Sequence, residues 1–222
     1  MDIQDNYTLT YVYTHFTEHT EFDRAKDMFE SRQYLKWVRE EGHTLDQRTH
    51  VSKALDLAVK DSSTYIVLVE GDFPLCGSKA WHEVLNVIYS ASIKSPNHCG
   101  VFVGTGGSGL FMKPDITKLV SKLLYKYLDL PPDIVIQQCL LGKLPECRQC
   151  SQTLVISKIL LMYHIGYDTS TSLDKSYGKD ELQCGWRHTS VRLISNHASI
   201  HAYSLFSFCQ NGYIQDYYRT MV

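Results

Sequence analysis

The sequence Tyr-Ile-Val-Leu-Val-Glu-Gly-Asp occupies positions 65–72 of this 222-residue chain. Its run of β-branched and aliphatic residues predicts a buried strand that ends in two carboxylates, Glu70 and Asp72. Ligands of open α/β sheets bind just outside the carboxyl ends of the strands. Because Gly71 has no side chain, both acids can approach one small, hard cation such as Mg²⁺ or Mn²⁺, and these ions partner phosphate groups. The alternative is a plain strand followed by an acidic turn.

Helical and strand-like patterns alternate on both sides of this strand. Predicted helices cover residues 21–41, 44–60 (capped by Thr44), 79–92, 114–128 and 134–141, and predicted strands lie within the first 14 residues and at 65–69, 100–103 and 154–163. Helices that alternate with strands are typical of an α/β fold. We therefore expect an α/β fold.

The composition narrows the classes of partner. Hydrophobic residues make up 44% of the chain and charged residues 21%, which is ordinary for a soluble globular protein. The formal net charge of −2 gives no electrostatic basis for binding nucleic acid or an anionic membrane. No apolar stretch approaches the roughly 20 residues of a membrane span, and residues 1–10 lack a signal-peptide core. Contact with a membrane is therefore expected only through an anchor outside these residues.

Seven cysteines and a glycosylation acceptor pattern at Asn6 favour a protein of the secretory lumen. Cys147 and Cys150 form a C-x-x-C pair, and together with Cys139 and His164 they raise the hypothesis of a zinc site. A single pair lacks the second pair that makes a zinc motif specific. We therefore expect a local disulfide or two unrelated thiols at this motif.

Gly104-Thr105-Gly106-Gly107-Ser108-Gly109 forms a glycine loop after a predicted strand. Its G-x-G-x-x-G spacing is that of a dinucleotide-binding fingerprint, which raises the alternative of an NAD-dependent oxidoreductase. The next helix begins only at Pro114 and the loop lies in mid-chain, and both facts argue against that alternative. The other interpretations are a tight turn with positive φ and a loop that lets a sugar or diphosphate lie against the backbone. The loop lacks the glycine spacing of a nucleophile elbow, so a catalytic triad at its serine is not expected.

In their order and spacing, several blocks resemble a glycosyltransferase of GT-A type. The likeness is strongest to the family that contains N-acetylglucosaminyltransferase IV and the GalNAc transferase that elaborates glycosylphosphatidylinositol anchors. It runs from about Arg48 to Ser172, a little over half of the chain. The blocks are Arg48 with 55–58 (Leu-Asp-Leu-Ala), 69–72 (Val-Glu-Gly-Asp), 109–111 (Gly-Leu-Phe) with 114–116 (Pro-Asp-Ile), Pro132-Asp133, the Cys147/Cys150 region, and 161–166 (Leu-Met-Tyr-His-Ile-Gly).

The resemblance implies a single GT-A-like (Rossmann-like) α/β domain over residues 1–172, with a mixed central sheet and flanking helices. This domain would be shortened before the acidic strand relative to the family, and a C-terminal extension over 173–222 would pack on it. It implies transfer of a sugar (GlcNAc, GalNAc or a hexose) from a UDP-sugar to a hydroxyl of a glycan or glycolipid, with inversion. Mn²⁺ or Mg²⁺ would be the cofactor, and the Golgi or ER lumen the compartment. The alternative is a catalytically degenerate relative that binds carbohydrate or serves as a scaffold.

The resemblance also assigns roles to residues around the acidic strand end. Glu70-Gly71-Asp72 resembles a metal-binding motif that is usually Glu-Asp-Asp in the family, so Gly71 replaces the middle acid. Asp72 would ligate the metal that bridges the donor diphosphate, and His164 would complete the metal site. Glu70 would lie near the nucleotide or order water on the metal.

Asp133 resembles the general base of inverting relatives, a role that a carboxylate within reach of a sugar hydroxyl can perform. Pro131 and Pro132 would stiffen the approach to it. Its alternative role is a helix N-cap, since an Asp after Pro-Pro and before an apolar run is a good cap. The nucleotide sugar is further expected to contact Arg48, Gly107, Ser108 and Gly109.

Overall fold

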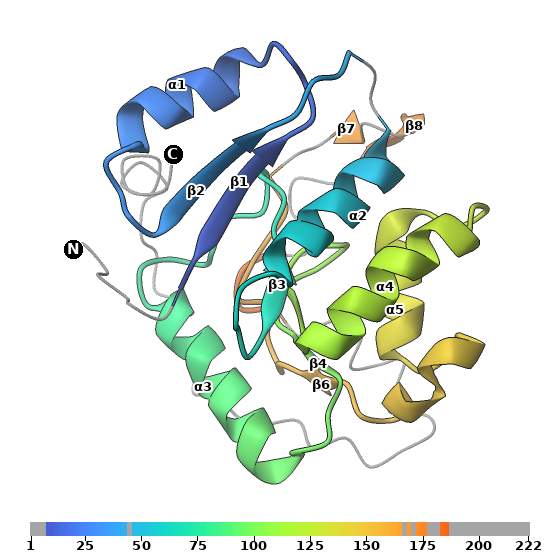
Figure 1. Ribbon diagram of the computed structural model, residues 1–222. Helices are drawn as coiled ribbons and strands as arrows, with labels where there is room; N and C mark the ends of the chain where they lie inside the picture. The colour runs from blue at the N-terminus through green and yellow to red at the C-terminus, as the bar shows by residue number, and fades with distance from the viewer. Residues whose placement is uncertain (1–7, 44–45, 166–167, 170–171, 177–182, 187–222) are drawn as a thin grey trace.

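The structure, a computed structural model, describes residues 8–43, 46–165, 168–169, 172–176 and 183–186 (Figure 1). The helices are α1 (Thr20–Phe29), α2 (Gln47–Ala58), α3 (Ala80–Lys94), α4 (Pro114–Lys126), α5 (Pro132–Leu140) and the 3₁₀ helix η1 (Pro145–Cys150). The strands are β1 (Thr10–Thr14), β2 (Leu35–Arg39), β3 (Ile66–Leu68), β4 (Gly100–Phe102), β5 (Leu110–Met112), β6 (Val155–Ile156), β7 (Asp168–Thr169) and β8 (Ser172–Ser176). The α/β class predicted from the sequence is confirmed.

A four-stranded mixed sheet lies at the centre of the fold, in the order β3-β5-β4-β6. β5 runs antiparallel to β3 and β4, whereas β4 and β6 are parallel. Side chains alternate between the two faces, as the pleat of a strand requires. In β3, for example, Ile66 packs into one apolar cluster and Val67 borders the other. The mixed central sheet is therefore confirmed.

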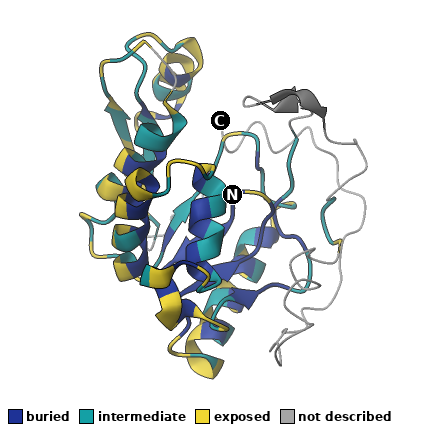
Figure 2. Cartoon of the chain, turned by 90° about the vertical axis from the view of Figure 1, so that its right-hand side faces the viewer, coloured by how far each residue is buried: buried dark blue, intermediate teal, exposed yellow. Residues whose placement is uncertain are grey.

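Helices cover both faces of this sheet. α2, α4 and α5 pack on one face and α3 packs on the other (Figure 1). Figure 2 shows buried residues along the strands and exposed residues on the outward faces of the helices. Within the described residues, no helix combines the length and apolarity that crossing a bilayer would require.

The first two strands form a parallel pair that α1 connects. Phe22 of α1 packs edge-on against Trp37 of β2, with ring centroids 5.4 Å apart. The prediction of one helix over 21–41 is wrong in its second half, because residues 35–39 pair with β1 and satisfy their backbone groups there. The spacing of apolar residues within the segment gives no information about a partner strand that lies elsewhere in the chain.

Two other predicted elements differ from the structure. α2 begins after Asp46, whose carboxylate accepts a hydrogen bond from the backbone N–H of Thr49, and the predicted cap Thr44 lies outside the described residues. The apolar segment 154–163 pairs within the central sheet only at β6. Its second half runs beside residues 72–76, with a bridge between Leu75 and Met162. Of the predicted extension over 173–222, residues 177–182 and 187–222 lie outside the described part.

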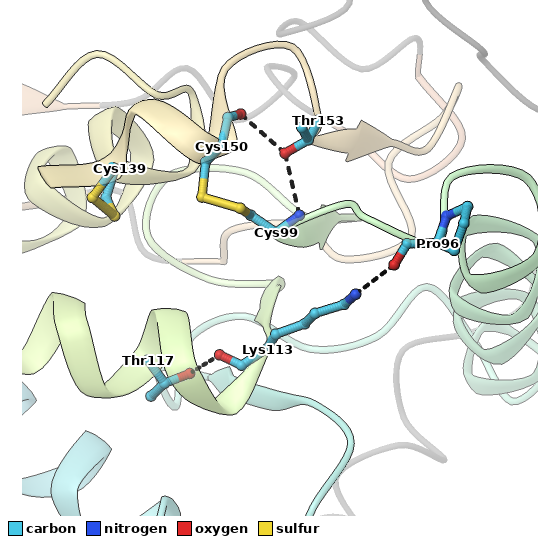
Figure 3. The surroundings of a disulfide bond; sticks show 8 residues. Pro96, Cys99, Lys113, Thr117, Cys139, Cys150 and Thr153 are labelled. Carbon is cyan, nitrogen blue, oxygen red and sulfur yellow. Dashed lines mark hydrogen bonds between the residues drawn. A yellow bond between two sulfur atoms is a disulfide. The ribbon is translucent and has the colours of Figure 1, made fainter. Parts of the chain in front are cut away.

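The described residues contain three disulfides: Cys76–Cys184 and Cys99–Cys150 join distant parts of the chain, and Cys139–Cys147 closes a short loop. One fastens η1 to the residue before β4 and another fastens η1 to α5 (Figure 3). Neither form of the expectation at the C-x-x-C motif holds: Cys147 and Cys150 do not bond each other and are not thiols, because each sulfur pairs with a cysteine outside the motif. The same pairing leaves neither sulfur for zinc. The spacing of the motif carries no information about these distant partners.

Candidate active site

The acidic end of β3 meets the glycine loop that connects β4 to β5. The loop reaches this edge because β5 runs antiparallel to β3, so β5 begins where β3 ends. Two hydrogen bonds join them: the backbone N–H of Gly109 donates to the carbonyl of Leu68 at 3.4 Å, and that of Glu70 donates to Oγ of Ser108 at 3.0 Å. Ser108 is fully buried, so it holds the backbone of Glu70 from inside the loop.

Gly107 brings Asp133 of α5 against this edge. A methyl group on Gly107 would lie 2.9 Å from Cβ of Asp133 and 3.8 Å from Oε1 of Glu70. Only glycine leaves room for so close an approach. From the next turn of α5, Nε2 of Gln137 donates to the carbonyl oxygen of Gly106 at 2.7 Å. The glycine loop thus sets how far Asp133 lies from Glu70.

The conformation of the loop agrees with the tight-turn interpretation. Gly106 and Gly109 have φ values of 58° and 79°, in the left-handed region that favours glycine. A side chain on Gly109 would also meet the backbone nitrogen of Gly104 at 2.7 Å. β5 follows Gly109 directly, so the loop does not open the helix that a dinucleotide fingerprint requires. The NAD alternative loses its one structural support.

Asp72 and His164 are 92 residues apart in the chain and touch in the fold. Nε2 of His164 lies 2.8 Å from Oδ2 of Asp72. The backbone N–H of Ile165 donates to the carbonyl of Asp72, and the ring of Phe73 packs against the imidazole with centroids 4.7 Å apart. The side chain of His164 is 13% exposed and that of Asp72 is 44% exposed. The histidine is therefore held in place while the carboxylate faces solvent.

The carboxyl group of Glu70 interacts electrostatically with the other charged groups of this cluster. Burial raises the pKa of its carboxyl group, the carboxylates of Asp72 and Asp133 raise that pKa further, and His164 opposes the shift. The three acids and the histidine therefore form one electrostatic unit. A bound cation would offset the repulsion among the carboxylates.

The cluster fits a divalent cation that is only partly ligated by protein. Within the described residues, no three His, Cys, Asp or Glu side chains are placed as a complete metal cage. Mg²⁺ and similar ions are usually held by one or two carboxylates and complete their coordination with water and substrate phosphates. Asp72 and His164 supply an oxygen and a nitrogen that lie 2.8 Å apart.

Asp133 is not the cap of its helix. Pro131 occupies the N-cap position, and Asp133 is the second residue of α5, without a side-chain capping bond. The capping alternative is wrong because Pro131 and Pro132 place the helix start earlier than the sequence pattern suggests. The carboxylate is therefore left for other chemistry at the rim of the cluster.

Arg48, predicted to contact the nucleotide sugar, has a different set of partners. Its guanidinium donates to the carbonyl oxygens of Leu124, Tyr127, Leu128 and Leu130 at 2.8–3.0 Å. These carbonyls lie at the end of α4 and in the turn after it, where helix carbonyls lack intrahelical partners. Arg48 thus holds the segment that leads into α5, and the structure does not bring it together with the acids.

Two residues of the site, Gln137 and Phe73, were not identified from the sequence. Gln137 lies one helical turn after Asp133, a spacing that places both on one face of α5. Phe73 directly follows the acidic motif. Both residues could have been predicted from their spacing to the neighbouring acids, once those acids are taken as site residues. Neither residue belongs to a distinctive sequence pattern of its own.

The chain matches no protein-family model, no curated protein and no solved structure when compared with each. Its function must therefore be inferred from the chemistry of the site and from the sequence resemblance.

Proposed function

We propose that this chain is a metal-dependent glycosyltransferase of GT-A type that moves a sugar from a UDP-sugar to a hydroxyl of a glycan or glycolipid. One observation carries the proposal: at the carboxyl end of β3, Glu70 and Asp133 lie beside Gly107, and Glu70 interacts electrostatically with the contacting pair Asp72 and His164. Sugar transfer from a nucleotide diphosphate needs a cation site, a place for the diphosphate and a base. The cluster offers residues for each of these needs.

Asp72 and His164 would hold Mn²⁺ or Mg²⁺. When bound, such an ion neutralises charge that builds on the leaving diphosphate. Backbone hydrogen bonds between residues 72–76 and 161–165 keep the two ligands together, since the N–H of Ile165 donates to the carbonyl of Asp72 itself. The packing of Phe73 on His164 fixes the ring orientation.

The glycine loop would take the diphosphate or sugar against its backbone. Gly106, Gly107 and Gly109 present no side chains, and Ser108 is turned inward toward Glu70. Gly107 lets Asp133 lie directly against the backbone of the loop, since a methyl group there would meet Cβ of Asp133 at 2.9 Å. This arrangement supports a role for the loop in donor binding, and Asp133 would then lie next to a sugar bound there.

Asp133 would accept the proton of the acceptor hydroxyl as that oxygen attacks the anomeric carbon. Direct attack by the acceptor inverts the anomeric configuration, and the resemblance implies the same outcome. Arg48 supports this role from a distance because it fixes the turn before α5. Gln137 supports it by bonding α5 to the glycine loop.

The disulfides support a luminal location. Disulfides form and persist in oxidising compartments and are rare in the cytosol. The described residues contain three of them, two of which fasten η1 to the sheet and to α5. We therefore place the proposed activity in the Golgi or ER lumen.

Binding of UDP is expected to depend on the cation. UDP at about 100 times its dissociation constant should raise the melting temperature (Tm) by roughly 5–11 °C in Mn²⁺, because ligand binding of that strength adds about 2.7 kcal/mol. The shift should vanish in EDTA and in Asp72→Asn with Mn²⁺ present. Differential scanning fluorimetry measures it, with ADP as the nucleotide control. An equal shift with UDP in EDTA would contradict the proposed cation, and no shift in Mn²⁺ would contradict donor binding.

Gly71 favours the second candidate, a carbohydrate-binding relative without turnover. The missing middle carboxylate lowers the negative charge available to the cation. A side chain at Gly71 would have no atom within 4 Å of its Cβ, so the position is open. Whether the site still binds a cation despite the missing charge at Gly71 therefore distinguishes an active transferase from a relative without turnover.

Gly71→Asp is expected to fold normally and to lower the Mn²⁺ concentration needed for half-maximal UDP stabilisation, because a third carboxylate strengthens attraction for the cation. Gly71→Asn is the matched control, with the same size and no charge. Titration of Mn²⁺ at fixed UDP measures the effect. If the natural chain shows neither UDP stabilisation nor donor hydrolysis and Gly71→Asp gains both, the chain is the degenerate relative.

A further inference from the structure

Trp186 lies in a short turn outside the acidic cluster, and its side chain is 51% exposed. The other two tryptophans of the chain are half-buried: Trp37 packs on Phe22, and Trp81 borders the apolar cluster under α3. Leaving so large an apolar ring in water forgoes the free energy of its burial. Tryptophan is also among the residues that contribute most to binding where they do contact a ligand or partner. The proposed sugar-transfer chemistry does not use this ring.

The backbone of Trp186 is held on both sides. Its N–H donates to the carbonyl of Gln183 at 3.1 Å, and its carbonyl accepts from the N–H of Leu160 at 2.8 Å. A disulfide joins Cys184, two residues earlier, to Cys76. The indole is therefore presented by a backbone that is already ordered, and a ligand that stacks on it loses little conformational entropy of the protein.

The turn lies at the same edge of the central sheet as the acidic cluster. β3, β4 and β6 run in one direction, because β5 is antiparallel to β3 and β4, and β6 is parallel to β4. The acidic motif follows β3, the glycine loop follows β4, and Leu160, the partner of Trp186, follows β6. The N–H of Leu161 donates to the carbonyl of Val103, just after β4. Trp186 is therefore held at the carboxyl ends of the strands, where ligands of α/β sheets bind.

A short stretch of chain separates this turn from the acids. Residues 161–165 bond to residues 72–76 at every second position, as an extended strand does. From Leu160 to His164 such a strand covers about 13 Å. This is the length of a short oligosaccharide, so a glycan whose reacting end lies at the acidic cluster can extend as far as Trp186.

The face of an indole suits a sugar ring. One face of a pyranose presents C–H groups, and the face of an aromatic ring carries the negative part of its quadrupole. We propose that Trp186 forms an acceptor subsite, where its indole stacks on a sugar ring of the acceptor glycan beyond the ring that reacts. This inference rests on the proposed function and assigns the acceptor, rather than the nucleotide, to this end of the site. The cation and the UDP-sugar are proposed to bind at the other end, so the subsite acts on acceptor binding alone.

The test measures the acceptor KM with Mn²⁺ and saturating UDP-GlcNAc or UDP-GalNAc. Trp186→Ala should raise the KM for triacetylchitotriose or mannotriose by about 10-fold, since it removes a buried aromatic contact. Its kcat should stay within about twofold, because the lost contact is made equally before and during reaction. Monosaccharide acceptors, N-acetylglucosamine and mannose, do not span the distance to Trp186, and their KM should not change. Trp186→Phe keeps an aromatic face and should lose less, and Tyr89→Ala, at a 69% exposed ring of α3, is the matched control.

Saturation-transfer NMR with the same trisaccharides, without donor, measures binding independently of turnover. The natural chain should transfer saturation to the sugar and Trp186→Ala should not, while the Mn²⁺-dependent UDP shift in Tm stays the same in both. If the natural chain shows neither a UDP shift nor transfer, the proposed function fails, and the NMR comparison alone decides the subsite. Should Trp186→Ala fail to fold by far-UV circular dichroism, Trp186→Leu, apolar but without an aromatic face, takes its place.

An unchanged trisaccharide KM in Trp186→Ala would overturn the subsite, whether or not kcat falls. An equal rise in KM for monosaccharides would also overturn it, because the effect would then lie at the reacting ring. So would unchanged saturation transfer in the variant, or the absence of binding of both trisaccharides to the natural chain.

Discussion

Replacing Asp133 with asparagine is expected to slow sugar transfer by about 10²–10⁴-fold, because an amide cannot take the proton of the attacking hydroxyl. Asparagine has nearly the same shape, so the contact between Gly107 and Cβ of residue 133 remains. The absence of a capping bond at Asp133 means that α5 loses no cap. The loss should therefore lie in the rate of transfer and not in stability.

Binding of the donor should survive the same substitution. Asp72 and His164 are untouched in Asp133→Asn, and the glycine loop keeps its hydrogen bonds to β3. The Mn²⁺-dependent rise in Tm with UDP should therefore stay within about 1 °C of that of the natural chain. Replacing Asp133 also removes one of the charges that raise the pKa of Glu70. The affinity for UDP should therefore change only slightly.

The measurement combines initial rates of transfer from UDP-GlcNAc and UDP-GalNAc to oligosaccharide acceptors with the UDP shift in Tm. Asp129→Asn, at an exposed position in the turn before α5, is the matched control and should leave both quantities unchanged. Retention of the transfer rate in Asp133→Asn would assign the base elsewhere. Joint loss of transfer and of the UDP shift would make Asp133 part of the metal or donor site.

The sequence predicts the acidic end of β3 well because the signal is local. An aliphatic run, two carboxylates and a glycine are adjacent in the chain, and residue type suffices to place the acids just after a strand. The strand is shorter and less buried than predicted, because β3 covers only Ile66–Leu68 at the edge of the sheet and Val69 is exposed. The positive φ values of Gly106 and Gly109 are likewise a local consequence of glycine in a short turn between strands. Such features need no knowledge of distant contacts.

Features that depend on distant partners were predicted poorly. β2 is a strand because β1 lies beside it, and Arg48 serves the carbonyls at the end of α4 because α2 packs along that helix. No period within either segment encodes these partners. The contact of Asp72 with His164 belongs to the same class, and only the order of blocks in the resemblance pointed to it. Sequence patterns identify the individual residues of a site, whereas the contacts between those residues depend on the fold.

Removing the disulfide between Cys99 and Cys150 is expected to lower the free energy of unfolding by about 4 kcal/mol, since it closes a loop of 51 residues. The bridge between Cys139 and Cys147 closes only 8 residues and should contribute about 2.5 kcal/mol. For a chain of this length, the corresponding losses in Tm are roughly 8–16 °C and 5–10 °C. The double alanine variants isolate each bridge, and alanine avoids placing a hydroxyl in these buried positions.

Thermal unfolding of the oxidised proteins by circular dichroism tests this order, with Cys209→Ala as the control that breaks none of these bridges.

The two bridges should differ in a second way, because Cys139 lies on α5, two residues beyond Gln137 and six beyond Asp133. Loss of the smaller loop should therefore reduce sugar transfer at temperatures well below Tm, where the chain is still folded. A larger fall in Tm for the Cys139/Cys147 variant would contradict the loop-closure argument. Unchanged transfer in that variant would show that Gly107 and Gln137 position α5 without the disulfide.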